Sequence, residues 1–589
     1  MNKKNGQTLK DIFEEAYSSY RKKDFKNAEL FCYKILSIDA NHLDSISLLS
    51  SVSVHKGDYA KAKKLMERGL EIDPKNTSFL SNLGTANKEL GNIKEAIKIY
   101  NKALKINPNH TNSNYNLGLA YYKLGDLKNA KKWLQKTVEI QNNYAVAFLS
   151  LGNVHFDLNE LKSAVSCYQK AIEINPNIIS AHNNLGLVFR DLNDLKNATS
   201  CYIKAIKLNP AYAHSHHNLA LVYKELGEFG KSIKSHEDAI KYESENLMHY
   251  HFLSELKKEV LDSDLKNKVQ KILSNKNPAT VNLAYGNYLL AKYENKDKNY
   301  QKELTHLIEG HKNFFNIHKA KFDLNNKFCF EDVHQIMQGA KLTKLTKKNK
   351  IDLKPIFIVG VPRCGSTVIE RIIGSGKKFI PIGEETGIIG KYIQQKVLEK
   401  KSLNLGATEE IRNELYNIYK ERGLVSEKYN YTFTDKSLDN FFYLKLLKEI
   451  YPKSKIINCK RNVLSSIMSI FQNNLTVLAW THNLDNIFKY FDNYLKIIRN
   501  YKESDPDLFY ELQFEELINN PEEESKKLMK YCDLPWDKKC LEYYKRKDLI
   551  SRTTSNLQIR KAIYKHSEKR YLPYKPFLDE YGYKYSWYN

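Results

Sequence analysis

The chain has 589 residues and a formal net charge of +25, from 93 Lys and Arg against 68 Asp and Glu. This length excludes a single hydrophobic core and favours three or four domain-sized units. The eight cysteines show no CxxC pair and no metal-ligand spacing, and no run of eighteen apolar residues occurs, so zinc modules and membrane-spanning helices are excluded. The N-terminus lacks the apolar segment of a signal peptide, and we expect a cytoplasmic protein with anionic partners or substrates.

A 34-residue repeat follows a short tail over residues 1–8. Its clearest marks are two pairs of prolines, each pair 34 residues apart: Pro74, Pro108, Pro176 and Pro210. Extended in both directions, this spacing gives seven units over residues 9–246. Alanine recurs at the twentieth position of the first six units, and glycine at the eighth position of four of them: Gly84, Gly118, Gly152 and Gly186. Small residues at these positions let two helices pack closely, so each unit is predicted to be a helix pair.

These units resemble the tetratricopeptide repeat (TPR). The resemblance implies an all-α, right-handed superhelix whose concave face binds a peptide or protein. The spacing fades after residue 246, and residues 247–345 are expected to be a helical connector of degenerate repeats. The basic segment "KLTKLTKKNKIDL" marks the boundary of a further domain, expected over residues 346–589.

Residues 355–376, "PIFIVGVPRCGSTVIERIIGSG", predict a strand, a turn of small residues and a helix. Such a turn presents free backbone N–H groups at the positive end of the helix dipole and holds an anion, most often a phosphate. The residues expected to bind this anion are Arg363, Cys364, Gly365, Ser366 and Thr367. The turn lacks the lysine of the nucleotide-triphosphate P-loop, GxxxxGK[ST], so a P-loop kinase is the weaker interpretation.

Four later segments alternate strand and helix in pattern. "KFIPIGEETGIIGKYI" predicts a short strand, a turn with two glutamates and a helix, and "YTFTDKSLDNFFYLKLLKEIYP" predicts a strand that ends at Asp435 and Lys436. "SKIINCKRNVLSSIMSIFQNN" and "DLFYELQFEELINNPEEESKKLMKYCDLP" repeat the order. The pattern indicates an α/β domain with a parallel sheet, whose ligands gather at the carboxyl ends of the strands.

In order, "PRCGST", "GEET", "TDKSLDN" and "CKRNVLSSIMS" resemble the PAPS-dependent sulfotransferases, in the branch that includes the protein-tyrosine sulfotransferases. The resemblance covers about residues 355–582 and implies 3′-phosphoadenosine 5′-phosphosulfate (PAPS) as sulfuryl donor. The family's first loop reads PRSGTT and binds the 5′-phosphosulfate. Its 3′-phosphate is bound by an arginine at a strand end and a serine eight residues later, which correspond to Arg461 and Ser469. A serine before a QxxK run reaches the sulfate in the family and corresponds to Ser555.

Sulfuryl transfer needs an in-line acceptor, neutralised charge on the equatorial oxygens and a stabilised leaving phosphate. The resemblance implies that Arg363 and its loop hold the phosphosulfate while Lys436 binds the bridging oxygen. The expected base is Glu385, with its neighbour Glu384 as the alternative. The scheme requires no metal. A structural alternative is that the two glutamates only stabilise the following helix N-terminus, and that Arg461 lies at a solvated strand exit.

The acceptor is left open by the motifs. In tyrosine sulfotransferases an arginine directly after GEET and another four residues later help to seat the acidic peptide, but here these positions hold Gly387 and Lys391. A protein tyrosine recruited by the repeats is one candidate acceptor, and a saccharide, a lipid or a small hydroxyl compound is the alternative. A scaffold whose transferase domain has lost activity is a further alternative. No nucleic-acid recognition module is apparent, so no nucleic-acid partner is expected.

Overall fold

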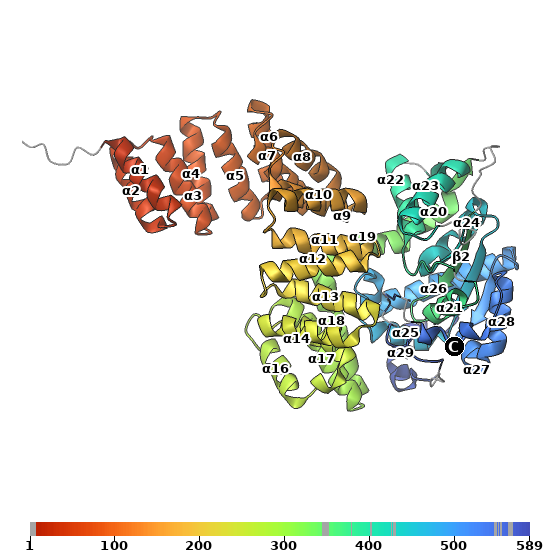
Figure 1. Cartoon of the computed structure of the whole chain (residues 1–589). Helices are drawn as coiled ribbons and strands as arrows, with labels where there is room; N and C mark the ends of the chain where they lie inside the picture. Colours follow the sequence, from red (N-terminus) through yellow and green to blue (C-terminus); the bar gives the residue numbers. More distant parts are fainter. Residues whose placement is uncertain are drawn as a thin grey trace, which may run out of the picture. The chain divides into compact units, whose positions relative to one another are not determined.

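The computed structural model describes residues 8–588 apart from 344–352, 379, 401–402, 426, 428–430, 547–549, 552, 554–555 and 564–568. The chain forms two compact units, Met1–Pro210 and Ala211–Asn589, which are described separately (Figure 1). None of the helices in the described part of the chain is long and apolar enough to cross a membrane.

The predicted helical repeats are present as seven pairs of helices. Their first helices begin at intervals of 34 residues, from Leu9 to Ala213. Six pairs lie in the first unit: α1 (Leu9–Arg21) with α2 (Phe25–Ile38), α3 (Leu43–His55) with α4 (Tyr59–Ile72), α5 (Thr77–Glu89) with α6 (Ile93–Ile106), α7 (Thr111–Lys123) with α8 (Leu127–Ile140), α9 (Ala145–Asp157) with α10 (Leu161–Ile174), and α11 (Ile179–Asp191) with α12 (Leu195–Leu208). The seventh pair, α13 (Ala213–Leu226) and α14 (Phe229–Tyr242), lies in the second unit.

Close packing within each pair explains the small residues of the repeat. A Cβ atom added to Gly84 would lie 2.4 Å from Cε1 of Tyr100, and one added to Gly186 would lie 2.6 Å from Cε1 of Tyr202. Both tyrosines are fully buried. A larger side chain at the eighth position would therefore displace the second helix, since a close-packed interior has no space for added atoms.

The helices that follow the repeats share one hydrophobic core with the sheet of the second unit. This core extends from Leu247 through Phe322 and Phe357 to Leu578. The connecting elements are α15 (Leu247–Leu256), η1 (Lys258–Val260), α16 (Ser263–Leu273), α17 (Thr280–Lys296), α18 (Tyr300–Ile317), α19 (Lys319–Lys327), the π-helix η2 (Phe328–Asp332) and α20 (Val333–Gly339). The expected domain boundaries at residues 246 and 345 stay predictions.

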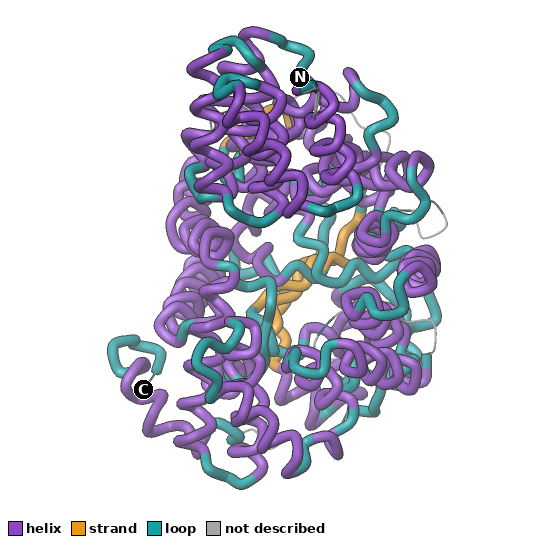
Figure 2. The backbone as a smooth tube through the Cα atoms, turned by 90° about the vertical axis from the view of Figure 1, so that its left-hand side faces the viewer, coloured by secondary structure: helices purple, strands orange, loops and turns teal. Residues whose placement is uncertain are grey.

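A parallel sheet of four strands organises the second unit, as predicted (Figure 2). Its order is β4 (Thr432–Asp435), β2 (Lys354–Gly360), β5 (Lys455–Lys460) and β6 (Tyr510–Gln513). Gly360 pairs with Cys459, and Lys460 pairs with Gln513. Because all four strands run the same way, their carboxyl ends lie along one edge. A second parallel pair joins β1 (Lys341–Thr343) to β3 (Asn404–Ala407).

One predicted strand is not formed in the described residues. The segment 378–383, outside Phe379, is irregular and makes a single backbone bond to the sheet, from Thr434 N–H to Pro381 O at 3.0 Å. The remaining helices surround the sheet: α21 (Ser366–Gly374), α22 (Ile388–Lys400), α23 (Thr408–Glu421), η4 (Leu438–Tyr443), α24 (Leu444–Ile450), α25 (Val463–Phe471), η5 (Ala479–His482), α26 (Leu484–Ser504), α27 (Phe514–Asn519), α28 (Pro521–Tyr531), η6 (Lys538–Cys540), η7 (Tyr543–Lys545), η8 (Leu572–Tyr574) and α29 (Lys575–Gly582).

Candidate active site

The predicted anion loop joins β2 to α21. Arg363 and Gly365 both have positive φ, 69° and 92°, so the chain turns sharply before the helix starts at Ser366. A Cβ atom on Gly365 would lie 2.1 Å from Cδ2 of Phe514, which leaves glycine as the residue that fits. The first N–H groups of α21 have no partner within the helix. A turn of this kind at a helix N-terminus can bind an anion through its backbone N–H groups.

The structure brings the predicted 3′-phosphate residues to this loop. Arg461, at the end of β5, donates to the backbone oxygen of Arg363 at 2.9 Å. Nε of Arg363 donates to Oγ of Ser469 on α25, also at 2.9 Å. Burial lowers the pKa of the Arg461 guanidinium, which lies over the ring of Phe514 at 5.6 Å. Two arginines and a serine from three separate segments thus meet at the carboxyl edge of the sheet.

Lys436 and Glu385 form an ion pair at the end of β4. Nζ of Lys436 lies 2.9 Å from Oε1 of Glu385, and the lysine side chain is fully buried while that of Glu385 is 53% exposed. Burial alone would lower the pKa of Lys436, but the charges of Glu385, Glu370 and Glu384 raise it above the usual value. The lysine is therefore a fixed cation, and the glutamate reaches solvent beside it.

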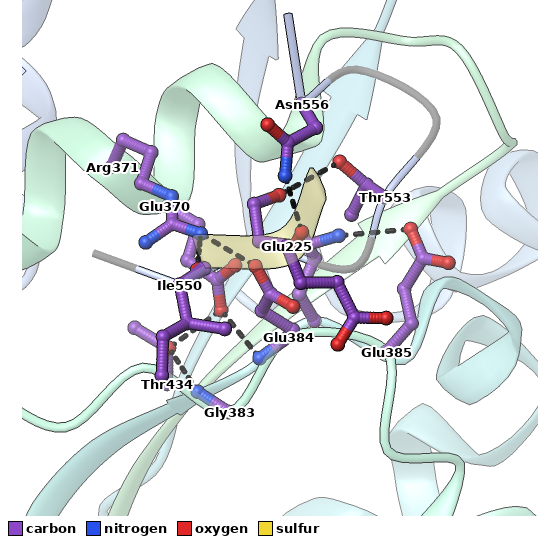
Figure 3. Close-up of polar contacts among 12 residues, drawn as sticks. Glu225, Glu370, Arg371, Gly383, Glu384, Glu385, Thr434, Ile550, Thr553 and Asn556 are labelled. Carbon is purple, nitrogen blue, oxygen red and sulfur yellow. Dashed lines mark hydrogen bonds and ion pairs between the residues drawn. The ribbon is translucent and has the colours of Figure 1, made fainter. Parts of the chain in front are cut away.

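The two glutamates of the GEET segment lie in different environments. Glu384 pairs with the buried Arg371 of α21 at 2.5 Å, and its side chain is 13% exposed. Its backbone oxygen accepts from the N–H of Lys436 at 3.0 Å. Glu384 is thus held inside the domain beside Arg371 (Figure 3), whereas the carboxylate of Glu385 accepts from Lys436 at 2.9 Å.

Glu370 and Arg371 of α21 were missed by the sequence analysis. Both are buried, and Oε1 of Glu370 accepts from Oγ1 of Thr434 at 2.7 Å and from the N–H of Glu384 at 3.0 Å. Burial raises the pKa of Glu370 to about 7. The sequence signal that reveals them is two adjacent charges within the otherwise apolar run "VIERIIG", because buried charges are retained where they are paired.

The C-terminal segment also reaches the anion loop. Arg363 donates to Oε1 of Gln558 at 3.3 Å, and this glutamine belongs to the QxxK run. Ser555, the serine predicted to reach the sulfate, lies outside the described residues. At the acceptor positions, the N–H of Gly387 donates to Oγ of Ser437 at 2.9 Å, and Lys391 is exposed on α22.

Cys364 of the loop and Cys459 of β5 form a buried thiol pair. A hydrogen bond from Cys459 lowers the pKa of Cys364, and burial raises the pKa of Cys459. Cys364 thus packs the loop against the sheet. Within the described part of the chain, no group of three His, Cys, Asp or Glu side chains is arranged to hold a metal ion.

Comparison with known proteins assigns families to both parts of the chain. Residues 355–538 match the model of the sulfotransferase family. Models of the tetratricopeptide repeat match residues 86–125, 111–144, 152–190, 186–227 and 213–246, and a model of subunit 3 of the anaphase-promoting complex matches residues 21–102.

Two curated relatives match parts of the chain. An uncharacterized protein of Aquifex aeolicus is 27% identical over 313 residues, which cover 50% of this chain and 40% of that protein. Protein-tyrosine sulfotransferase A of Caenorhabditis elegans is 23% identical over 248 residues, which cover 39% of this chain and 63% of that protein. The chain thus spans less than two thirds of either relative.

Solved structures similar to part of the chain include MamA. The match is 28% identical and covers 28% of this chain and 95% of MamA, with a TM-score of 0.27. YrrB, described as a TPR protein with an unusual peptide-binding site, is 21% identical and covers 32% of this chain and 96% of YrrB with a TM-score of 0.29. The family matches and the parallel sheet together lead to one conclusion: the chain carries tetratricopeptide repeats within residues 86–246 and a sulfotransferase-family domain that includes residues 355–538.

Proposed function

We propose that the chain transfers the sulfuryl group of PAPS to a hydroxyl acceptor. The observation that carries this proposal is the Lys436–Glu385 pair at the end of β4, on the same sheet edge as the loop that holds Arg363. A buried cation and an exposed carboxylate beside an anion loop provide the two groups that transfer to a hydroxyl requires.

The donor side fits a nucleotide with two phosphate groups. The loop N–H groups from Gly365 to Thr367 and the Arg363 guanidinium would hold the 5′-phosphosulfate, while Arg461 and Ser469 would hold the 3′-phosphate. PAPS would supply an activated sulfuryl group whose leaving phosphate needs neutralisation. Lys436 would provide that charge, since its raised pKa keeps it protonated.

Glu385 is proposed as the base because its carboxylate is exposed and Glu384 is not available. Glu384 is committed to Arg371 at 2.5 Å and faces the domain interior. Glu385 would accept the proton of the acceptor hydroxyl, and Lys436 would hold its carboxylate in place at 2.9 Å.

We further propose a protein tyrosine, presented by a peptide bound to the repeats, as the acceptor. The family match of the repeats and the 23% identity to a protein-tyrosine sulfotransferase support this choice. A saccharide, a lipid headgroup or a small phenol is the competing acceptor, because Gly387 replaces one of the two arginines of the tyrosine-specific enzymes.

The experiment is transfer of ³⁵S from labelled PAPS, with release of 3′-phosphoadenosine 5′-phosphate (PAP) followed in parallel. The acceptors are an acidic tyrosine peptide, its phenylalanine counterpart, a saccharide mixture and 4-nitrophenol. Label on the tyrosine peptide alone supports the full proposal. Label on a saccharide or phenol instead would contradict the tyrosine acceptor and would still support sulfuryl transfer. No PAP release with any acceptor or with water contradicts sulfuryl transfer.

A further inference from the structure

The seventh helix pair differs from the other six at the end of its first helix. Glu225 of α13 is 4% exposed. Among the Asp, Glu, Lys and Arg side chains of residues 8–246, all of which the structure describes, Glu225 alone is buried. At the same position of the repeat, the earlier pairs carry residues that are exposed or half-buried: Arg21, His55, Glu89, Lys123, Asp157 and Asp191.

The C-terminal segment of the transferase domain covers this end of α13. The backbone oxygen of Glu225 accepts from Ser551 N–H and from the guanidinium of Arg560, each at 3.3 Å. Nε of Arg560 also donates to Asn556 at 3.2 Å. The guanidinium lies 5.7 Å from the ring centre of Phe229, at the start of α14. Arg560 therefore attaches the C-terminal segment to both helices of the seventh pair.

Gly227, between α13 and α14, leaves the space that the Arg560 guanidinium occupies. A Cβ atom at Gly227 would lie 2.3 Å from Cζ of Arg560. Gly125 occupies the same position three repeats earlier, with φ of 78° against 77° at Gly227, and its Cβ would meet nothing within 4 Å. The two glycines thus share the same backbone requirement and differ in the contact with Arg560.

The segment held by α13 continues to the catalytic groups. The backbone oxygen of Ile550, next to Ser551, accepts from Arg371, and the same Arg371 nitrogen pairs with Glu384 (Figure 3). The backbone oxygen of Glu384 accepts a hydrogen bond from the N–H of Lys436, and Glu384 directly precedes Glu385 in the chain. An unbroken series of hydrogen bonds and chain neighbours therefore runs from the seventh pair to the Lys436–Glu385 pair.

We propose that the seventh repeat is a positioning element of the sulfuryl-transfer site, acting through the contact of Gly227 with Arg560. The contact fixes the segment at Ile550 and Ser551, and Arg371 and Glu384 then align Glu385 with Lys436. The inference rests on the proposed function for its catalytic consequence. Its structural consequence, the ordering of the GEET segment, is independent of any substrate.

The experiment compares Gly227→Ala with Gly125→Ala in the full chain. Alanine at Gly227 displaces the flexible end of Arg560 and leaves the helices intact, whereas alanine at Gly125 introduces the backbone strain alone. Two readouts are amide hydrogen exchange over residues 366–376 and 383–387, and PAP release from PAPS with water as acceptor. Calorimetry with PAP reports on the donor site.

For Gly227→Ala we expect faster exchange over residues 383–387, kcat about tenfold lower and KM for PAPS within twofold of the wild type. Gly125→Ala should leave exchange at these residues and kcat unchanged. In an Arg560→Ala background, the additional effect of Gly227→Ala should disappear, because both changes remove the same contact.

Equal behaviour of the two glycine variants overturns the proposal, as does full additivity of Gly227→Ala with Arg560→Ala. A PAP affinity that falls as far as kcat also overturns it, since the seventh pair would then support the whole domain. If the wild type neither binds PAP nor consumes PAPS, the proposed function fails, while hydrogen exchange still decides whether the seventh pair orders the GEET segment.

Discussion

The repeats and the transferase domain bury different kinds of residue. In the helix pairs, the repeated interior positions are alanines and glycines packed against tyrosine or leucine, as at Ala96, Gly84 and Tyr100. In the transferase domain, Asp435 and Lys436 are buried at the end of β4, and Glu370 and Arg371 of α21 are buried close to them, with Glu370 bound to Thr434. Buried charges are costly unless they are paired, so their concentration marks a site selected for chemistry. Close packing of small and apolar residues stabilises the repeats, whereas paired buried charges form the candidate site of the transferase domain.

The largest expected effect comes from comparing substitutions of the two adjacent glutamates, Glu384 and Glu385. Glu385→Gln removes the exposed carboxylate beside Lys436, and we expect kcat to fall about 10²- to 10⁴-fold. We expect a smaller loss of stability than at Glu384, because Glu385 is half exposed and Lys436 keeps the charges of Glu370 and Glu384 nearby. Glu384→Gln leaves the buried Arg371 without its charged partner, and we expect a loss of about 3 kcal/mol in the free energy of unfolding.

The measurements are PAP release and urea unfolding of both variants. The assignment of the base is wrong if Glu384→Gln abolishes turnover at wild-type stability and Glu385→Gln retains it.

Lys436→Met is expected to lower kcat about 10²- to 10³-fold, because a side chain of similar length loses the charge that we propose neutralises the leaving phosphate. Lys445→Met, on the exposed face of α24, is the matched control and should retain wild-type turnover. Steady-state PAP release measures both. Turnover within threefold of the wild type in Lys436→Met would remove this lysine from the chemistry.

Glu370→Gln tests the electrostatics of the buried group through stability. The folded pKa of Glu370, about 7, lies above the ordinary value of 4.5, so the folded protein binds more protons than the unfolded chain between these values. Stability from this group is therefore complete below about pH 4.5 and is lost as pH rises to 7, by on the order of 3 kcal/mol.

Glu370→Gln should remove that slope, which urea unfolding midpoints at pH 5 and pH 8 will measure. Glu580→Gln, on the exposed surface of α29, should keep the wild-type slope. An unchanged slope in Glu370→Gln would place the titrating group elsewhere.

The sequence predicted the parts of this molecule that repeat or carry a motif. Prolines and small residues at a spacing of 34 located the helix pairs, and three of the four ordered motifs located the carboxyl ends of β2, β4 and β5. Local patterns specify such elements because each strand or helix has its own periodicity. Outside Phe379, the strand predicted before GEET is not formed, and Pro381 accepts one backbone hydrogen bond from Thr434 of β4.

Contacts between residues far apart in the chain could not be predicted from the sequence. Nothing near Arg371 in the chain indicates its bonds to Glu384 and to Ile550, which is 179 residues away. Likewise Glu225 and Arg560, 335 residues apart, meet only in the folded domain. Such pairs depend on the tertiary arrangement, and the repeat register does not reveal them, because Glu89 and Gly125 stand at the positions of Glu225 and Gly227 in earlier repeats.

We propose that the anion loop and the end of β5 form a site for a 3′,5′-bisphosphate nucleotide. Calorimetric titration of the full chain with PAP, with AMP and ATP–Mg²⁺ as controls, tests it most directly, repeated on Arg461→Ala. We predict tight binding of PAP, weak binding of AMP, and a loss of PAP affinity of at least tenfold in Arg461→Ala, because a charged hydrogen-bond partner of the 3′-phosphate is removed. Tighter binding of ATP–Mg²⁺ than of PAP, or no nucleotide binding at all, would contradict the account.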